Sequence, residues 1–129
     1  KQIPKEFFLA IQRWVSSDKS GEYKESWQQF KTRCISALQQ IITQTLADKK
    51  MSAASTKSKD ILVFTSGGPI SVIIQHILQL SDQQTLMINQ QLRNTSVTKL
   101  LFSEKMLNVD YINNYSHLEL AGVEWLTFR

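Results

Sequence analysis

The 129-residue sequence has little of what several protein classes require. Its single cysteine, Cys34, cannot form a disulfide within the chain, and no secretory signal is visible, so a reducing cytoplasm is expected. Its longest apolar runs, such as residues 61–64 and 72–74, fall far short of the ~20 residues that span a bilayer, which predicts no membrane partner. Four glycines and two prolines exclude a collagen-like chain.

What is present fits one ordinary globular domain. Hydrophobic residues make up 42% of the chain and charged residues 20%, which excludes a disordered tail. The chain opens at Lys1 rather than at Met, so we expect its own N-terminus, with any signal it carries, to lie upstream. Residues 1–129 are therefore treated as one domain or a portion of one.

Positive charge is in mild excess, with a net charge of +4. The local cluster of Lys49, Lys50, Lys57 and Lys59 flanks the small polar stretch 51–58, which is typical of a solvated loop. A nucleic-acid surface interleaves basic and aromatic side chains, and this stretch has no aromatic residue. We therefore predict no nucleic-acid partner.

Two helices are expected in the first third of the chain. Apolar residues at helical spacing predict a helix over residues 4–15. Ser26 and Gln29 form a capping box that begins a longer helix, running to about residue 47. Cys34 lies on its apolar stripe, and a buried structural thiol is favoured over a nucleophile because no activating neighbour is visible.

The pattern then changes to strands and shorter helices. The apolar run 61–65 predicts a strand covered on both faces, as parallel strands of α/β proteins are. Two further β runs, 96–102 and 107–113, predict an antiparallel hairpin in which Leu107, Val109 and Tyr111 share one face. The remaining expectations are a helix over 70–80, a capped helix over 82–89, a loop over 113–119, and a last strand or ordered tail over 123–128.

The turn between the strand at 61–65 and the next helix carries the one chemical signal. Ser66, Gly67 and Gly68 allow a sharp turn and a close approach of the backbone to a ligand. The helix that follows points free N–H groups and its positive dipole end at the same place, so a phosphate or carboxylate is a natural ligand. The alternative is a tight turn whose glycines serve packing alone.

Other catalytic and metal motifs are absent from the sequence. It contains no HExxH, no CxxC and no histidine cluster with metal-ligand spacing. His76 and His117 are 41 residues apart and cannot be paired from sequence; both are interpreted as packing or surface residues. No metal site is predicted.

Four sequence blocks in a fixed order carry a family resemblance. They are Gly21-Glu22 to Glu25-Ser26-Trp27 with Phe30 and Arg33, the run 61–70, Asn94-Thr95-Ser96-Val97-Thr98, and Asn113 with His117-Leu118. Together they resemble the histidine phosphatase superfamily, in its phosphoglycerate-mutase-like branch, over about residues 22–118.

The resemblance implies a three-layer α/β fold, with a sheet between helices on both faces. It implies transfer of a phosphoryl group to a histidine and then to water or a second hydroxyl, without metal or other cofactor. The partner is a phosphorylated small molecule or another anion, held in part by Ser66, Gly67 and Gly68. A hydrolase is favoured over a mutase, because nothing specifies a second phosphate site.

Two departures from the family pattern limit what is carried over. The sequence lacks the Arg-His-Gly nucleophile motif, so it resembles the C-terminal half of a family member, and no catalytic residue is assigned. Ser66 takes the place of the second histidine, and a hydroxyl brings no imidazolium charge. The alternative is a non-catalytic module that binds a phospho-ligand.

The missing Arg-His-Gly strand also bears on the sheet. The resemblance places that strand beside residues 61–65. We therefore expect an edge of 61–65 to be left open, or to be completed by an N-terminal segment or by a second copy of the chain.

Overall fold

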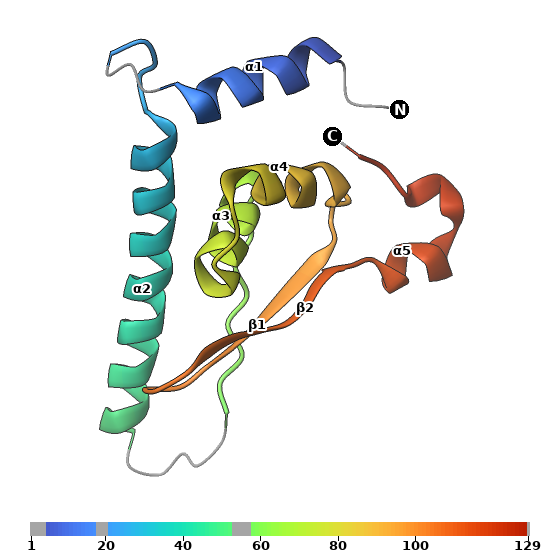
Figure 1. The fold of residues 1–129 in the computed structure, drawn as a ribbon. Helices are drawn as coiled ribbons and strands as arrows, with labels where there is room; N and C mark the ends of the chain where they lie inside the picture. The colour runs from blue at the N-terminus through green and yellow to red at the C-terminus, as the bar shows by residue number, and fades with distance from the viewer. Residues whose placement is uncertain (1–4, 18–20, 53–57, 129) are drawn as a thin grey trace.

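The structure is a computed structural model that describes residues 5–17, 21–52 and 58–128. Along one side of the molecule runs the long helix α2, and the other helices and a β-hairpin lie beside it (Figure 1). The elements in chain order are α1 (Lys5–Ser16), α2 (Trp27–Met51), α3 (Gly67–Leu78), α4 (Asp82–Gln91), β1 (Val97–Phe102), β2 (Leu107–Asn114), α5 (Ser116–Ala121) and the 3-10 turn η1 (Val123–Trp125).

Both predicted capping boxes are confirmed. The Gln29 N–H donates to Ser26 Oγ at 3.1 Å, and the Ser26 N–H donates to Gln29 Oε1 at 2.9 Å. Ser81 and Gln84 repeat the pair of bonds at 3.2 and 2.9 Å. Each box satisfies two N–H groups that a helix start leaves free, so α2 and α4 begin where the sequence predicts.

A small aromatic core joins α1, α2 and α3. The Trp14 and Trp27 ring centroids lie 5.3 Å apart, edge to face, and the Trp27 and Phe30 centroids lie 5.9 Å apart. Val72 of α3 and Cys34 of α2 are buried in the same cluster. Burial raises the pKa of the Cys34 thiol, and the prediction that Cys34 is buried is confirmed.

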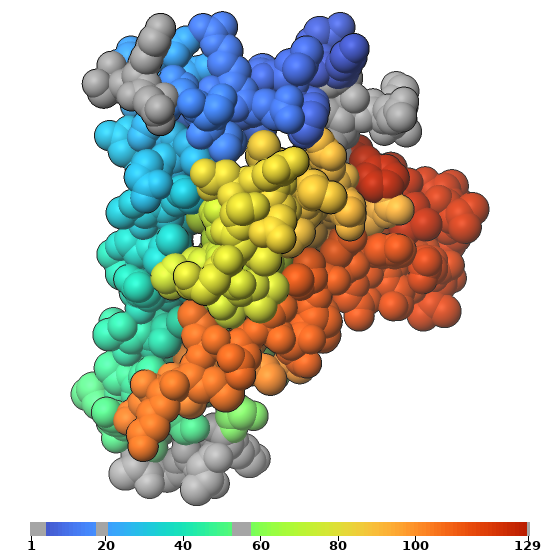
Figure 2. Space-filling model, viewed as in Figure 1, coloured from blue at the N-terminus to red at the C-terminus, as the bar shows by residue number. Residues whose placement is uncertain are grey.

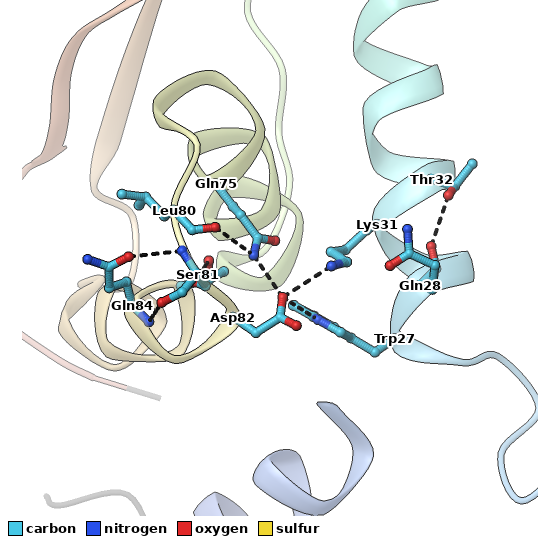
Figure 3. A network of polar contacts seen from close by, with 10 residues as sticks. Trp27, Gln28, Lys31, Thr32, Gln75, Leu80, Ser81, Asp82 and Gln84 are labelled. Carbon is cyan, nitrogen blue, oxygen red and sulfur yellow. Dashed lines mark hydrogen bonds and ion pairs between the residues drawn. The ribbon is translucent and has the colours of Figure 1, made fainter. Parts of the chain in front are cut away.

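A single carboxylate ties three helices together (Figure 3). Asp82 Oδ1 accepts hydrogen bonds from Trp27 Nε1 at 2.8 Å, from Lys31 Nζ at 3.1 Å and from Gln75 Nε2 at 2.7 Å. Trp27 and Lys31 belong to α2, Gln75 to α3 and Asp82 to α4. This contact fixes how the α3–α4 pair sits on α2, which places the start of α3.

The hairpin is antiparallel as predicted, with Phe102 paired to Leu107 and Val97 to Asn114. Its predicted alternation is wrong at one position, because Leu107 and Val109 are half-buried while Tyr111 is 38% exposed. The register shifts on both sides of Lys99, which faces Tyr111. An irregularity of this kind turns later side chains to the other face.

The predicted strand at residues 61–65 is not formed. The described sheet consists of β1 and β2 alone, so residues 61–65 pair with neither. Leu62 is 83% exposed and Phe64 94%, which makes the expectation of two covered faces wrong. A strand needs neighbours for its backbone hydrogen bonds, and the described part of the chain supplies none here. The alternative expectation of an open edge is confirmed within that part.

Other boundaries also differ from the predictions. Helix α3 begins at Gly67 rather than at residue 70, so both glycines lie inside its first turn. The predicted loop over 113–119 is wrong from Ser116 onward, where hydrogen bonds to Tyr115 O and Leu118 O build α5. Residues 123–128 form η1 and an ordered tail, which is one of the two predicted alternatives. Of the predicted loop over 51–58, residues 53–57 lie outside the described residues.

Candidate phosphate-binding site

The candidate site is the start of α3. Ser66 is the N-cap of this helix, with extended backbone (φ −103°, ψ 169°) and an exposed side chain that makes no capping hydrogen bond. Its neighbours Gly67 and Gly68 are half-buried. The Ser66 hydroxyl is therefore not used by the helix and is free to bind a ligand.

The first turn of α3 also leaves backbone donors unused. Pro69 has no N–H, and the Ile70 N–H donates to Ser66 O at 3.4 Å. Among the described residues, the N–H groups of Gly67 and Gly68 have no backbone acceptor. Two N–H groups, one hydroxyl and the positive end of the helix dipole thus converge on one place, which suits an oxyanion.

The glycines do not act as the sequence predicts. Neither Gly67 nor Gly68 adopts a positive φ, so the sharp turn does not depend on glycine backbone freedom. Instead, a Cβ on Gly68 would lie 3.3 Å from Phe30 Cζ, closer than most real Cβ contacts. Packing therefore accounts for Gly68, as the alternative interpretation proposed, and it does so without using the Gly68 N–H.

A buried hydroxyl that sequence reasoning missed holds this turn in place. Ser71 is 1% exposed, and its Oγ donates to Gly67 O at 2.8 Å. Asn89 Nδ2 of α4 donates to the same Oγ at 3.1 Å. The first turn of α3 is thus anchored to α4. No local pattern marks Asn89, because it lies 18 residues from Ser71.

The histidines do not join the site. His76 is exposed on α3 and His117 is exposed on α5, and neither imidazole has a hydrogen bond or ion pair with another described residue. No group of three or more metal-ligating side chains occurs in the described ranges. None of the described helices has the length and apolar character to cross a bilayer. A hollow along α2, lined by residues such as Ser36, Gln40 and Gln44, contains no titratable side chain.

Comparison with known families identifies the fold to which these elements belong. The family model of the histidine phosphatase superfamily (branch 1) matches residues 1–115. The chain belongs to the histidine phosphatase superfamily. The suspected family is thus confirmed, and the helices with a two-stranded sheet form part of this α/β fold. Neither the curated proteins nor the solved structures include a significant match.

The family match includes the residues at the start of α3 but not His117. The match includes Ser66, Gly67 and Gly68 at the start of α3. It ends at Tyr115, so His117 lies beyond it. The sequence holds no Arg-His-Gly motif, and residue 66 is a serine. The described groups are able to hold an oxyanion, but they include no imidazole to attack it.

Proposed function

We propose that this chain supplies part of the phosphate pocket of a histidine phosphatase that hydrolyses phosphomonoesters. The observation that carries the proposal is the start of α3, where the Gly67 and Gly68 N–H groups and the Ser66 hydroxyl have no hydrogen-bond partner among the described residues. These donors hold the non-bridging phosphoryl oxygens. They also stabilise the negative charge on those oxygens as the ester bond breaks.

The nucleophile in this proposal comes from a segment outside these 129 residues. An imidazole nitrogen of that segment attacks phosphorus, and the ester bond breaks as the alcohol leaves with a proton. Water then attacks the phosphohistidine, releasing phosphate and restoring the imidazole. The segment pairs with residues 61–65, which lead directly into Ser66 and have open edges in the described structure.

The exposed surface supports a covering segment. Leu62, Val63 and Phe64, in the run that leads into Ser66, are 83%, 59% and 94% exposed. A contiguous run of exposed apolar side chains is typical of an interaction site. A second copy of this chain is the alternative occupant of the same edge.

The proposal also includes a cytoplasmic setting, in which the lone thiol of Cys34 stays reduced.

A second candidate function is a non-catalytic module that binds a phosphorylated ligand. Ser66 at the second histidine position favours it, because a hydroxyl donates one hydrogen bond but adds no positive charge to the pocket. Such a module uses the same three donors at the start of α3 and needs no nucleophile.

The decisive experiment measures turnover of para-nitrophenyl phosphate by residues 1–129 and by the protein extended through its upstream coding sequence. We expect no turnover from residues 1–129, and turnover from the extended protein if the extension carries Arg-His-Gly. Ser66→Ala should weaken phosphate binding about five- to tenfold, because one hydrogen bond to a charged ligand is lost. Ser116→Ala, at an exposed serine of α5, is the matched control.

The outcomes separate the two candidates. Phosphate binding without turnover in the extended protein supports the binding module. Turnover by residues 1–129 themselves, abolished by Ser66→Ala, contradicts the external nucleophile. Phosphate binding that Ser66→Ala leaves unchanged contradicts the site at α3. Slower amide exchange at residues 61–65 in the extended protein supports the proposed strand pairing.

A further inference from the structure

The guanidinium of Arg93 has two nitrogens without a hydrogen-bond acceptor. Arg93 lies between α4 and β1, and its Nε and Nη1 atoms are buried without a hydrogen-bond partner. No ion pair among the described residues includes Arg93. Leaving a buried donor unpaired is unfavourable, and more so for a charged group, so such a group needs an explanation.

Aromatic rings cover this guanidinium. Arg93 Cζ lies 3.3 Å from the centroid of the Phe128 ring and 5.3 Å from that of the Tyr115 ring. The ring faces attract the positive charge, but they do not accept the N–H groups that point outward in the guanidinium plane. Nε and Nη1 are therefore shielded from water while their hydrogen-bonding capacity is unused.

The backbone around Arg93 is held firmly. The Arg93 N–H donates to Asn113 Oδ1 at 2.8 Å, and Asn113 Nδ2 donates to Gln91 O at 2.9 Å. Asn113 thus fixes the connection from α4 to β1 against the end of β2. The backbone from which the Arg93 side chain extends is consequently fixed.

The segment that carries Phe128 is held next to Arg93 by its backbone and by Thr127. Asn94 donates to Thr127 through its N–H and its Nδ2, each at 3.0 Å, and Arg93 and Phe128 form an isolated bridge. Figure 2 shows this red C-terminal segment against the end of α4. Phe128 remains 38% exposed, so it is only partly packed into the protein.

We propose that Arg93 is the anchor of an oxyanion-binding site that Phe128 covers in this structure. A cation is repelled there, and a neutral apolar group leaves the in-plane donors unpaired. A phosphate or carboxylate satisfies both the charge and the guanidinium N–H groups. The site lies between α4 and β1, on groups separate from the first turn of α3, so it does not depend on the function proposed above.

The test titrates the 129-residue protein with inorganic phosphate, and separately with acetate, while NMR follows the Arg93 Nε–Hε resonance. We expect the resonance to shift saturably, and Phe128→Ala to bind about tenfold more tightly because the covering ring is gone. Arg93→Gln should abolish the phosphate-dependent shifts at Asn94 and Asn113, whereas Ser66→Ala should leave the Arg93 shift unchanged. Phe64→Ala, at an exposed ring elsewhere, is the matched control.

The remaining outcomes decide against the site or define its ligand. Phe128→Leu removes the ring face while keeping an apolar side chain at the bridge, in case Phe128→Ala disturbs the tail. An Arg93 resonance that stays fixed in the unmodified protein and in both Phe128 variants overturns the proposal. A shift that disappears in Ser66→Ala assigns the binding to α3 and also overturns it. A response to phosphate but not acetate identifies a phosphoryl ligand, and the reverse identifies a carboxylate.

Discussion

Helix α3 and the run of residues 61–64 just before it are both strongly apolar, yet their burial is opposite. Val72 and Ile74 of α3 are 0% exposed, whereas Leu62 is 83% and Phe64 94% exposed. The helix satisfies its own backbone hydrogen bonds and needs only one apolar face to dock on α2 and α4. An extended run needs neighbouring strands as well. Hydrophobicity alone therefore does not bury a segment; available partners do.

The largest expected effect tests this contrast directly. Ile74→Ala should destabilise the protein by about 3 kcal/mol, because it removes fully buried methylenes and leaves a cavity. Leu62→Ala should change the free energy of unfolding by less than about 0.5 kcal/mol. Urea denaturation of both variants measures the difference. A large loss in Leu62→Ala would show that residues 61–64 are packed in solution, and a doubled solution mass would then identify a second copy as the cover.

An intermediate loss of stability is expected at Asp82, whose carboxylate joins α4 to α2 and α3. Asp82→Ala leaves Trp27 Nε1 without its acceptor and Gln75 Nε2 with Leu80 O alone, and should cost about 2 kcal/mol. Asp82→Asn keeps one acceptor oxygen and should cost less. Equal stability of the alanine variant and the unmodified protein in urea would contradict this role.

The same carboxylate predicts a pH dependence. Burial by itself raises the pKa of Asp82, but the hydrogen bonds from Gln75, Trp27 and Lys31 outweigh it, so the pKa lies below its ordinary value. The group is therefore more acidic in the folded state than in the unfolded state. Its stabilising contribution is present above the unfolded pKa of about 4 and is lost as pH falls through the folded pKa. As the pH is lowered, the free energy of unfolding should decrease more for the unmodified protein than for Asp82→Asn, as measured by urea denaturation at each pH.

The smallest loss of stability is expected where α2 meets the turn of the β1–β2 hairpin. Lys50 Nζ of α2 lies 2.8 Å from Glu104 Oε1 in the hairpin turn, and both side chains are more than half exposed. The hydrogen bond that Glu104 accepts from Lys50 lowers the pKa of the Glu104 carboxyl. Glu104→Gln should lower the thermal midpoint only slightly at low salt and not at all at about 1 M salt, where charges are screened within ~3 Å. A salt-independent loss would mean that the turn contacts α2 by packing instead.

Local features of this protein follow from the sequence because their partners are a few residues away. The capping boxes at Ser26 and Ser81 each join residues three apart, and the hairpin joins two adjacent β runs across a short turn. The ordered set of family blocks and the candidate site at the start of α3 also follow from short motifs. The same motifs place α3 three residues late, because a Gly-Gly-Pro run does not reveal that its glycines are already helical.

Tertiary structure decided the features whose partners are distant in the chain. Asp82 meets Trp27 across 55 residues, and Asn94 meets Thr127 across 33, so no local pattern announces the three-helix contact or the cover on Arg93. The conformation of residues 61–65 is another feature that tertiary structure decided. Their sequence determines that the run is apolar and suited to a strand. Whether it becomes one depends on neighbouring backbone groups, and the described part of the chain leaves those places open.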